Sequence, residues 1–206
     1  RAVVMSNSTL RRIQKECREV VTSDEMIDLG ITLEILDESS FSHIQAEVRG
    51  PPDTPYEGGR FKLDVVFPDE YPFKPLKAQF ITKVWHPNVS SVTGLICLDA
   101  LKDKWSASFS LRTVLLSIQN LLASPEPSDP QDAVVAKQYM SQREEFDKTA
   151  RFWAQYFASA PGDKDEHLMA LVKKVAQQTK SETQSIALLS CNSWDSARAI
   201  DYAKST

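Results

Sequence analysis

Apolar and polar residues alternate along the first half of the chain in segments of four to seven residues. Alternation with a period of two buries one face of a strand and leaves the other face more polar. Turn or loop residues separate the segments at 37–40 and at 50–55. The pattern predicts a four-stranded antiparallel meander. The predicted strands cover residues 31–35, 44–48, 61–67 and 79–81.

Helical spacing follows on either side of these strands. Four apolar residues at helical intervals predict an amphipathic helix over residues 8–22, capped by Asn7 or Ser8. The stripe consists of Leu10, Ile13, Cys17 and Val20. Residues 111–123 are apolar around most of the helix girth, so this helix, capped by Ser110, is expected at the centre of the core.

Two further helices are predicted before residue 158. Asp129 can cap a helix that opens at Pro130, a favoured first position, and runs to about Met140. Residues 141–144 have the sequence of a capping box for the next helix. The inner face of that helix carries Phe146, Ala150, Trp153 and Phe157.

Residues 158–163 are small and polar and include Pro-Gly, which marks a domain boundary. We predict a first domain over residues 1–160, a linker at 161–164 and a second domain over 165–206. The second domain is expected to be a small bundle with a thin core. Its three helices are predicted at 165–177, 181–190 (capped by Ser181) and 195–204 (capped by Asp195).

Composition narrows the class of protein. The 206 residues carry a net charge of −4 and 42% apolar residues, which predicts a globular protein with neither a nucleic-acid nor a membrane partner. The three cysteines are too widely spaced for a disulfide framework or a zinc site, so we expect no metal and no cofactor. Their spacing fits a reducing compartment, and we expect the cytoplasm, with the nucleus as a second location.

The candidate chemistry lies in residues 85–99. His86, Asn88 and Cys97 fall within a dozen residues, and Pro87 and Gly94 exclude a regular helix there. A lone intracellular cysteine is usually a small buried apolar residue, and we assign that role to Cys17. Cys97 instead lies where an irregular loop returns to apolar sequence.

Three motifs resemble those of the ubiquitin-conjugating enzymes. His86-Pro87-Asn88 is followed by Cys97, then by Leu98-Asp99 and Trp105; PPDTPYEGG occupies residues 51–59 and YPFKP occupies residues 71–75. The resemblance covers roughly residues 8–158. It implies the α+β ubiquitin-conjugating fold: an N-terminal helix, the four-stranded meander and C-terminal helices. The tail resembles, less closely, the three-helix ubiquitin-associated (UBA) domain of one subgroup.

The resemblance also implies the reaction. Such an enzyme accepts ubiquitin from the activating enzyme as a thioester, here on Cys97, and passes it to lysine amines, extending polyubiquitin chains in this subgroup. Asn88 is either the donor to the oxyanion or a brace for its own loop. Asp129 either orients the amine and receives its proton or simply caps a helix, and both roles remain open.

Other residues are assigned to positioning and to partners. Asp99, Leu101 and His86 are expected to position the thioester, His86 as a structural residue that locks its turn; Leu101 is alternatively core. Phe73, Ala107 and Ser108 are implied ligase contacts. Arg11, Arg12 and Lys15 are implied contacts of the activating enzyme, or alternatively form an ordinary solvated face.

Three departures from the family pattern limit these expectations. Leu76 stands where the family usually has a second proline. Ser106-Ala107-Ser108 contains no proline where the family has its second ligase-contacting loop, so ligase binding should be softer or more selective. Residues 178–180 are Gln-Thr-Lys, where UBA domains usually carry an apolar loop. We therefore expect the bundle to form but not to bind ubiquitin tightly.

Two rival functions are weighed against the transferase. A catalytically silent scaffolding relative would commonly lack the cysteine, which this chain keeps. A cysteine hydrolase needs a histidine oriented against the thiol. The only candidates are His43 in a strand, His167 in the tail and His86 in a stiff loop, so hydrolysis is disfavoured.

Overall fold

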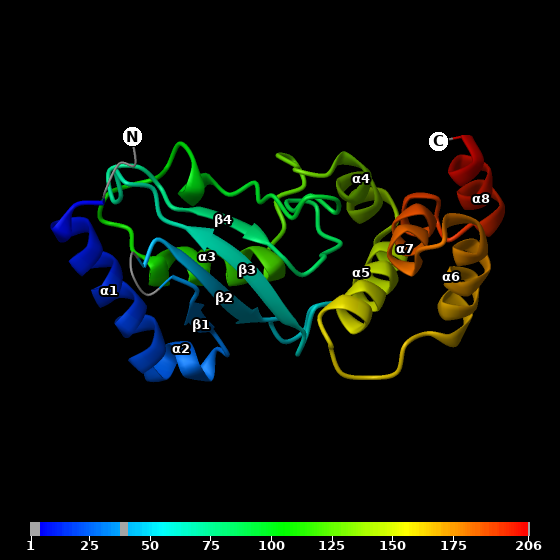
Figure 1. The fold of residues 1–206 in the computed structure, drawn as a ribbon. Helices are drawn as coiled ribbons and strands as arrows, with labels where there is room; N and C mark the ends of the chain where they lie inside the picture. The colour runs from blue at the N-terminus through cyan, green and yellow to red at the C-terminus, as the bar shows by residue number, and fades with distance from the viewer. Residues whose placement is uncertain (1–4, 38–40, 206) are drawn as a thin grey trace.

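The computed structural model describes residues 5–37 and 41–205 (Figure 1). The turn predicted at 37–40 therefore lies largely outside the described residues. A sheet and helices fill the N-terminal part of the molecule, and helices alone make up the C-terminal part (Figure 1). The mixed α+β class is confirmed.

The four strands form one antiparallel sheet in sequence order, as the alternation predicts. In the register of the central pair, Ala46 faces Leu63, and on the other side Ala46 faces Leu33. Alternate residues of the two central strands are buried, which places the core on one face of the sheet. The strands are β1 (Thr32–Ile35), β2 (His43–Arg49), β3 (Arg60–Val66) and β4 (Lys77–Phe80).

The first helix, α1 (Asn7–Thr22), begins one residue earlier than predicted. Its N-cap is Ser6, whose hydroxyl accepts a hydrogen bond from the Thr9 N–H, so the expected caps Asn7 and Ser8 are wrong. A five-residue helix, α2 (Asp24–Asp28), follows and was too short to be predicted. The central helix α3 (Leu111–Ala123) is confirmed, and Ser110 caps it through the Thr113 N–H.

Two predicted caps near the next helices are wrong. Helix α4 (Ala133–Ser141) is capped by Asp132, not Asp129, because the backbone before it stays irregular and donates to the Pro87 carbonyl. The capping box at 141–144 does not form. The Ser141 hydroxyl donates back to the Lys137 carbonyl within α4, and Gln142 precedes α5 (Arg143–Phe157) without a side-chain cap.

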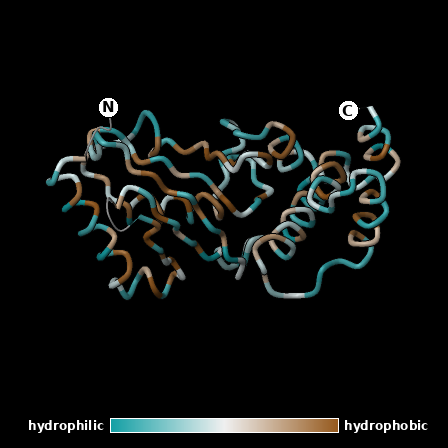
Figure 2. The backbone as a smooth tube through the Cα atoms, viewed as in Figure 1, coloured by the Kyte–Doolittle hydropathy of each residue, from teal (hydrophilic) through white to brown (hydrophobic). Residues whose placement is uncertain are grey.

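The tail consists of three helices, and Ser181 and Asp195 cap the second and third as predicted. The helices are α6 (Glu166–Thr179), α7 (Glu182–Cys191) and α8 (Ser196–Ser205). The caps are Asp165 for α6, Ser181 for α7 and Asp195 for α8. Figure 2 shows the connection from α5 to α6 in pale and teal colours, in keeping with the polar linker. The division of the chain into two domains stays a prediction.

The tail packs against the outer side of α5, which the sequence pattern did not foresee. The Trp153 indole N–H donates to the Ser190 hydroxyl at 2.8 Å, and the Trp194 indole N–H donates to the Thr149 hydroxyl at 2.9 Å. The rings of Trp194 and Phe152 meet edge to face with centroids 5.0 Å apart. Helix α5 also contacts the first part of the chain, because the Trp153 ring lies against the Trp85 ring with centroids 5.1 Å apart.

Among the described helices, none combines the length and the apolar content needed to cross a bilayer.

Candidate active site

The loop after β4 returns to the sheet edge and fixes the position of Cys97. Gly94 has φ +78°, and a Cβ there would lie 2.0 Å from the Phe80 carbonyl oxygen, so only glycine fits this close approach. The Phe80 N–H donates to the Gly94 carbonyl, and the Cys97 N–H donates to the Asn88 carbonyl at 2.8 Å. The thiol is thus carried on backbone that is hydrogen-bonded on both sides.

His86 holds the start of this loop against α3. Its ring is fully buried; Nε2 donates to the Leu121 carbonyl at 2.9 Å and Nδ1 accepts the Asn88 N–H at 3.0 Å. Burial lowers the pKa of His86 to about 4, so the imidazole is neutral near pH 7. Both ring nitrogens are used by backbone groups, which suits the expected structural role and does not provide a base for a hydrolase.

Asn88 joins the Cys97 loop to the segment before α4. Its side chain is 1% exposed. Its Nδ2 donates to the carbonyls of Glu126 (2.9 Å) and Asp129 (3.0 Å), and its Oδ1 accepts the Glu126 N–H at 2.8 Å. This geometry is that of the brace. The oxyanion role stays a prediction, and it requires one of the two N–H groups to leave a backbone carbonyl.

Asp132 forms a second connection between the Cys97 loop and the segment before α4, and the sequence did not predict it. The Asp132 carboxylate accepts both the N–H and the hydroxyl of Ser91, at 3.2 and 2.6 Å. The N–H groups of Gln131 and Asp132 both donate to the Pro87 carbonyl. Asp132 follows Pro130 by two residues, so the sequence could have suggested it as an alternative cap. No local pattern in the sequence indicates its hydrogen bonds to Ser91.

Three reactive groups converge where these two segments meet. The Lys102 ammonium lies 3.2 Å from the Cys97 sulfur, and the sulfur lies 3.4 Å from the Asp129 carboxylate. Cys97 is half-buried, whereas Lys102 and Asp129 are exposed. The hydrogen bond to Cys97 is the largest cause that raises the pKa of Lys102 above its usual value. The structure therefore brings Asp129 to Cys97 as expected and adds Lys102, which the sequence analysis did not single out.

The turn that carries Lys102 also carries two predicted positioning residues. A short 3₁₀ helix, η1 (Asp99–Leu101), follows Cys97, and Leu101 packs half-buried against the core. Asp99 pairs with the Lys104 ammonium at 2.5 Å, a contact that raises the pKa of Lys104. Cys97 and Lys102 are thus separated by one tight turn, and that five-residue spacing is the signal that could have indicated Lys102.

The predicted ligase contacts lie together. Phe73 is 83% exposed, and Ser108 is exposed beside the half-buried Ala107. The Trp105 indole N–H donates to the Pro72 carbonyl at 2.8 Å and joins the two segments. Leu76, the departure from the family's second proline, is buried in the core.

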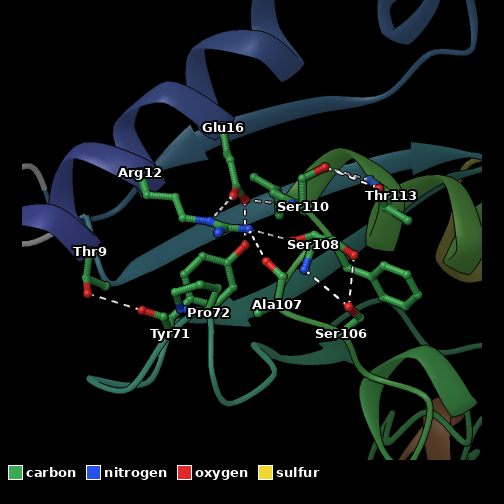
Figure 3. A network of polar contacts seen from close by, with 12 residues as sticks. Thr9, Arg12, Glu16, Tyr71, Pro72, Ser106, Ala107, Ser108, Ser110 and Thr113 are labelled. Atoms are coloured by element: carbon green, nitrogen blue, oxygen red, sulfur yellow. Dashed lines mark hydrogen bonds and ion pairs between the residues drawn. The ribbon is translucent and has the colours of Figure 1, made fainter.

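The predicted cationic face of α1 is divided. Arg11 and Lys15 are exposed, whereas Arg12 turns inward toward the segment that carries Ala107 (Figure 3). In the tail, Gln178 and Thr179 end α6 and Lys180 is its C-cap. Gln178 and Lys180 are exposed and Thr179 is half-buried, so the junction of α6 and α7 is polar as expected. Within the described part of the chain, no group of histidine, cysteine or acidic residues is arranged to hold a metal ion.

Known proteins of one family match this chain over most of its length. The ubiquitin-conjugating enzyme family matches residues 12–154. Ubiquitin-conjugating enzyme E2 21 of Caenorhabditis elegans is 47% identical over 198 residues, covering 96% of this chain and 92% of the relative. Ubiquitin-conjugating enzyme E2 K of Homo sapiens is 49% identical over 191 residues, covering 93% and 94%.

A solved structure from the same family has a similar fold. The E2 domain of a Toxoplasma gondii ubiquitin conjugating enzyme superposes with a TM-score of 0.65 at 44% identity, covering 72% of this chain and 98% of that domain. Family membership brings with it the cysteine thioester reaction and the general partners of that reaction, which are ubiquitin, the activating enzyme and ligases. The motifs, the fold and these relatives together place the chain in the ubiquitin-conjugating enzyme family, with a UBA-like bundle at its C-terminal end.

Proposed function

We propose that Cys97 is the residue that carries ubiquitin as a thioester and that the acceptor lysine approaches it beside Asp129. In loading, the thiolate attacks the thioester on the activating enzyme, the new C–S bond forms and the old one breaks. In transfer, the lysine nitrogen attacks the same carbonyl carbon, the bond to Cys97 breaks and an isopeptide bond forms.

The observation that carries this proposal is the placement of Cys97 between an ammonium and a carboxylate, at 3.2 and 3.4 Å. The Lys102 ammonium donates a hydrogen bond to the sulfur, and thiolate is the attacking form in loading. A lysine amine is mostly protonated near pH 7, so transfer needs a group that orients it and accepts its proton. Asp129 is assigned that role.

The remaining site residues are assigned to support. Asn88 is proposed to brace the loop and, when one N–H is released, to donate to the oxyanion of the tetrahedral intermediate. His86 fixes the loop, while Asp99 and Leu101 position the thioester from the η1 turn.

Partners and setting are assigned as follows. Phe73, Ala107 and Ser108 contact ligases, and Arg11 and Lys15 face the activating enzyme. The products are ubiquitin chains on protein substrates. The enzyme acts in the cytoplasm, with the nucleus as a second location, and residues 161–164 link two domains.

A loading assay tests the acyl carrier directly. The chain is incubated with activating enzyme, ubiquitin and ATP, and the product is separated with and without reductant. We expect one ubiquitin adduct that thiol removes, that is absent in Cys97→Ala and that becomes thiol-resistant in Cys97→Ser. Cys191→Ala, which changes an exposed cysteine on α7, is the matched control and should load normally.

The same assay separates the rivals. An adduct that persists in Cys97→Ala would overturn the assignment of the acyl carrier. No adduct from folded wild-type protein would favour a scaffolding relative. Cys97-dependent hydrolysis of a ubiquitin ester without transfer to lysine would favour the hydrolase, which the engaged nitrogens of His86 disfavour.

A further inference from the structure

A buried carboxylate on α1 joins three parts of the molecule. Glu16 is 6% exposed, and its Oε2 accepts the Tyr71 hydroxyl at 2.6 Å and the Leu111 N–H at 2.8 Å (Figure 3). Its Oε1 accepts the Arg12 Nε–H at 2.8 Å. A buried charge is tolerated when it is paired and hydrogen-bonded, and Glu16 meets both conditions.

Arg12 extends this network to the segment at 105–110, which carries the proposed ligase contacts Ala107 and Ser108. Its Nη2 donates to the carbonyls of Ala107 (2.7 Å) and Phe109 (3.0 Å), which are 95 and 97 residues away in the sequence. The guanidinium also lies 5.4 Å from the centre of the Tyr71 ring. Hydrogen bonds with a charged donor are about twice as strong as neutral ones, and the planar fork fixes direction as well as distance.

Both segments that carry the proposed ligase contacts are therefore attached to one helix. The segment at 68–75 is attached through the Tyr71 hydroxyl and through the Tyr71 carbonyl, which accepts from the Thr9 hydroxyl at 3.1 Å. The segment at 105–110 is attached through Arg12. By contrast, the Phe73 side chain projects into solvent and is 83% exposed.

We propose that Arg12 and Glu16 are positioning residues for ligase recognition, which hold the segments at 68–75 and 105–110 in one arrangement. The inference rests on the proposed ligase role of Phe73, Ala107 and Ser108 and names the residues that set their relative placement. A surface fixed in advance does not have to be ordered when the partner binds, so its affinity is higher.

The network also changes the assignment of Arg12. Three donors of its guanidinium are engaged inside the molecule, and its side chain is only 33% exposed. Arg11 and Lys15 are exposed on the same helix and remain available to the activating enzyme. Loss of the Arg12 side chain should therefore disturb ligase-stimulated transfer more than it disturbs loading.

Hydrogen exchange tests the positioning itself. In Arg12→Ala, we expect amide exchange at residues 106–109 to become at least tenfold faster, with residues 86–97 unchanged. Arg12→Lys keeps the charge without the fork and should give an intermediate rate. Arg18→Ala removes an exposed arginine from the same helix and is the matched control. Unchanged exchange at 106–109 in Arg12→Ala would overturn the proposal.

Single-turnover discharge tests the consequence for ligase binding. The preformed thioester is discharged onto free lysine with increasing amounts of an isolated RING domain that accelerates the wild-type enzyme. Arg12→Ala should raise the half-maximal RING concentration about tenfold, with the maximal rate and the rate without RING unchanged, and Arg12→Lys should recover part of the loss. An equal fall in the rate without RING would indicate general damage and overturn the positioning role.

Phe73→Ala separates this inference from the function on which it rests. Because its side chain is exposed, this change should weaken the RING dependence while leaving exchange at 106–109 as in the wild type. If Phe73→Ala leaves the RING dependence unchanged, the ligase assignment of the surface is wrong. If Phe73→Ala weakens it and Arg12→Ala does not, the surface is right and the positioning role is wrong.

Discussion

The candidate active site has two layers that differ in exposure and in the kind of bond they use. In the lower layer, His86 and Asn88 are at most 1% exposed, and their side chains bond to backbone groups 35 to 41 residues away, except for one local bond. In the upper layer, the half-buried Cys97 sulfur contacts the exposed side chains of Lys102 and Asp129.

In the proposed function, this difference separates the residues that hold the site from the residues that react in it. A buried polar group that loses its partner costs its full desolvation, about 1–3 kcal/mol, whereas exposed charges in contact contribute about 0–1 kcal/mol. Changes in the lower layer should therefore reduce both stability and transfer. Changes in the upper layer should alter the chemistry and leave the stability of the fold unchanged.

The largest effect is expected for Asn88→Ala. This change removes three hydrogen bonds and leaves the Glu126 N–H without its acceptor in a part-buried place. We expect unfolding to become easier by about 3 kcal/mol and transfer to lysine to slow by about a hundredfold. Urea unfolding and single-turnover discharge measure the two quantities.

A matched control is Asn192→Ala in the tail. Its amide also donates to a backbone carbonyl, that of Leu188 at 2.8 Å, but far from Cys97 in the chain. It should leave transfer unchanged. If Asn88→Ala slows transfer without loss of stability, the oxyanion role prevails and the separation of the two layers fails for this residue.

The second-largest effect is expected at acid pH, where His86 should lower the free energy of unfolding. Its folded pKa of about 4 lies below the ordinary value of 6.5, because burial disfavours the charged ring. The unfolded chain therefore binds more protons between these values, so the contribution of neutral His86 is complete above pH 6.5 and is lost as the pH falls toward 4. At about 1.4 kcal/mol for each pH unit, the total is about 3 kcal/mol.

Urea unfolding between pH 7.5 and pH 4 measures this dependence. His86→Gln should flatten it over that range, although its stability at pH 7.5 will be lower. His167→Ala removes an exposed histidine and should keep the wild-type slope. A wild-type slope in His86→Gln would mean that other groups cause the acid sensitivity.

Asp129→Asn should affect transfer alone. The amide cannot receive the proton of the incoming lysine, so we expect transfer to slow by about thirtyfold, below the usual range for acid–base catalysis because water can substitute in part. Loading and stability should stay as in the wild type, since the side chain is exposed. Asp163→Asn, on the exposed linker, is the control.

An equal loss of loading and transfer in Asp129→Asn would contradict the assigned role, because loading exchanges one thioester for another without a lysine. A loss of stability of more than about 1 kcal/mol would contradict the division into layers.

Local patterns predicted the elements better than they predicted the contacts between them. Alternation identified all four strands, and the apolar girth of residues 111–123 identified α3 as a core helix. Serine and aspartate before helical stretches identified Ser110, Ser181 and Asp195 as caps. Each of these features is determined within a few residues of the chain, which is why a sequence alone carries it.

Other errors and omissions come from contacts between segments that are distant in the sequence. Asp129 was expected as a cap because Pro130 is a favoured first helical residue, yet the Pro87 carbonyl holds the backbone at 131–132 and delays the helix. The bonds of Arg12 to the Ala107 segment, and the packing of Trp194 on α5, join residues far apart in the sequence. Family motifs supplied Cys97 and Asp129, but only the fold placed Lys102 against the sulfur.

The smallest effect is expected for Lys102→Met, which removes the ammonium from the sulfur of Cys97. Because the ammonium is exposed, solvent and salt screen it, and we expect loading to slow only about threefold at low salt and less at high salt. Alkylation of Cys97 by iodoacetamide should slow to the same extent, since thiolate is the attacking form in both reactions. Lys173→Met, an exposed lysine on α6, is the control for net charge. A large loss of stability, or an effect on loading that salt does not reduce, would assign Lys102 to the lower layer instead.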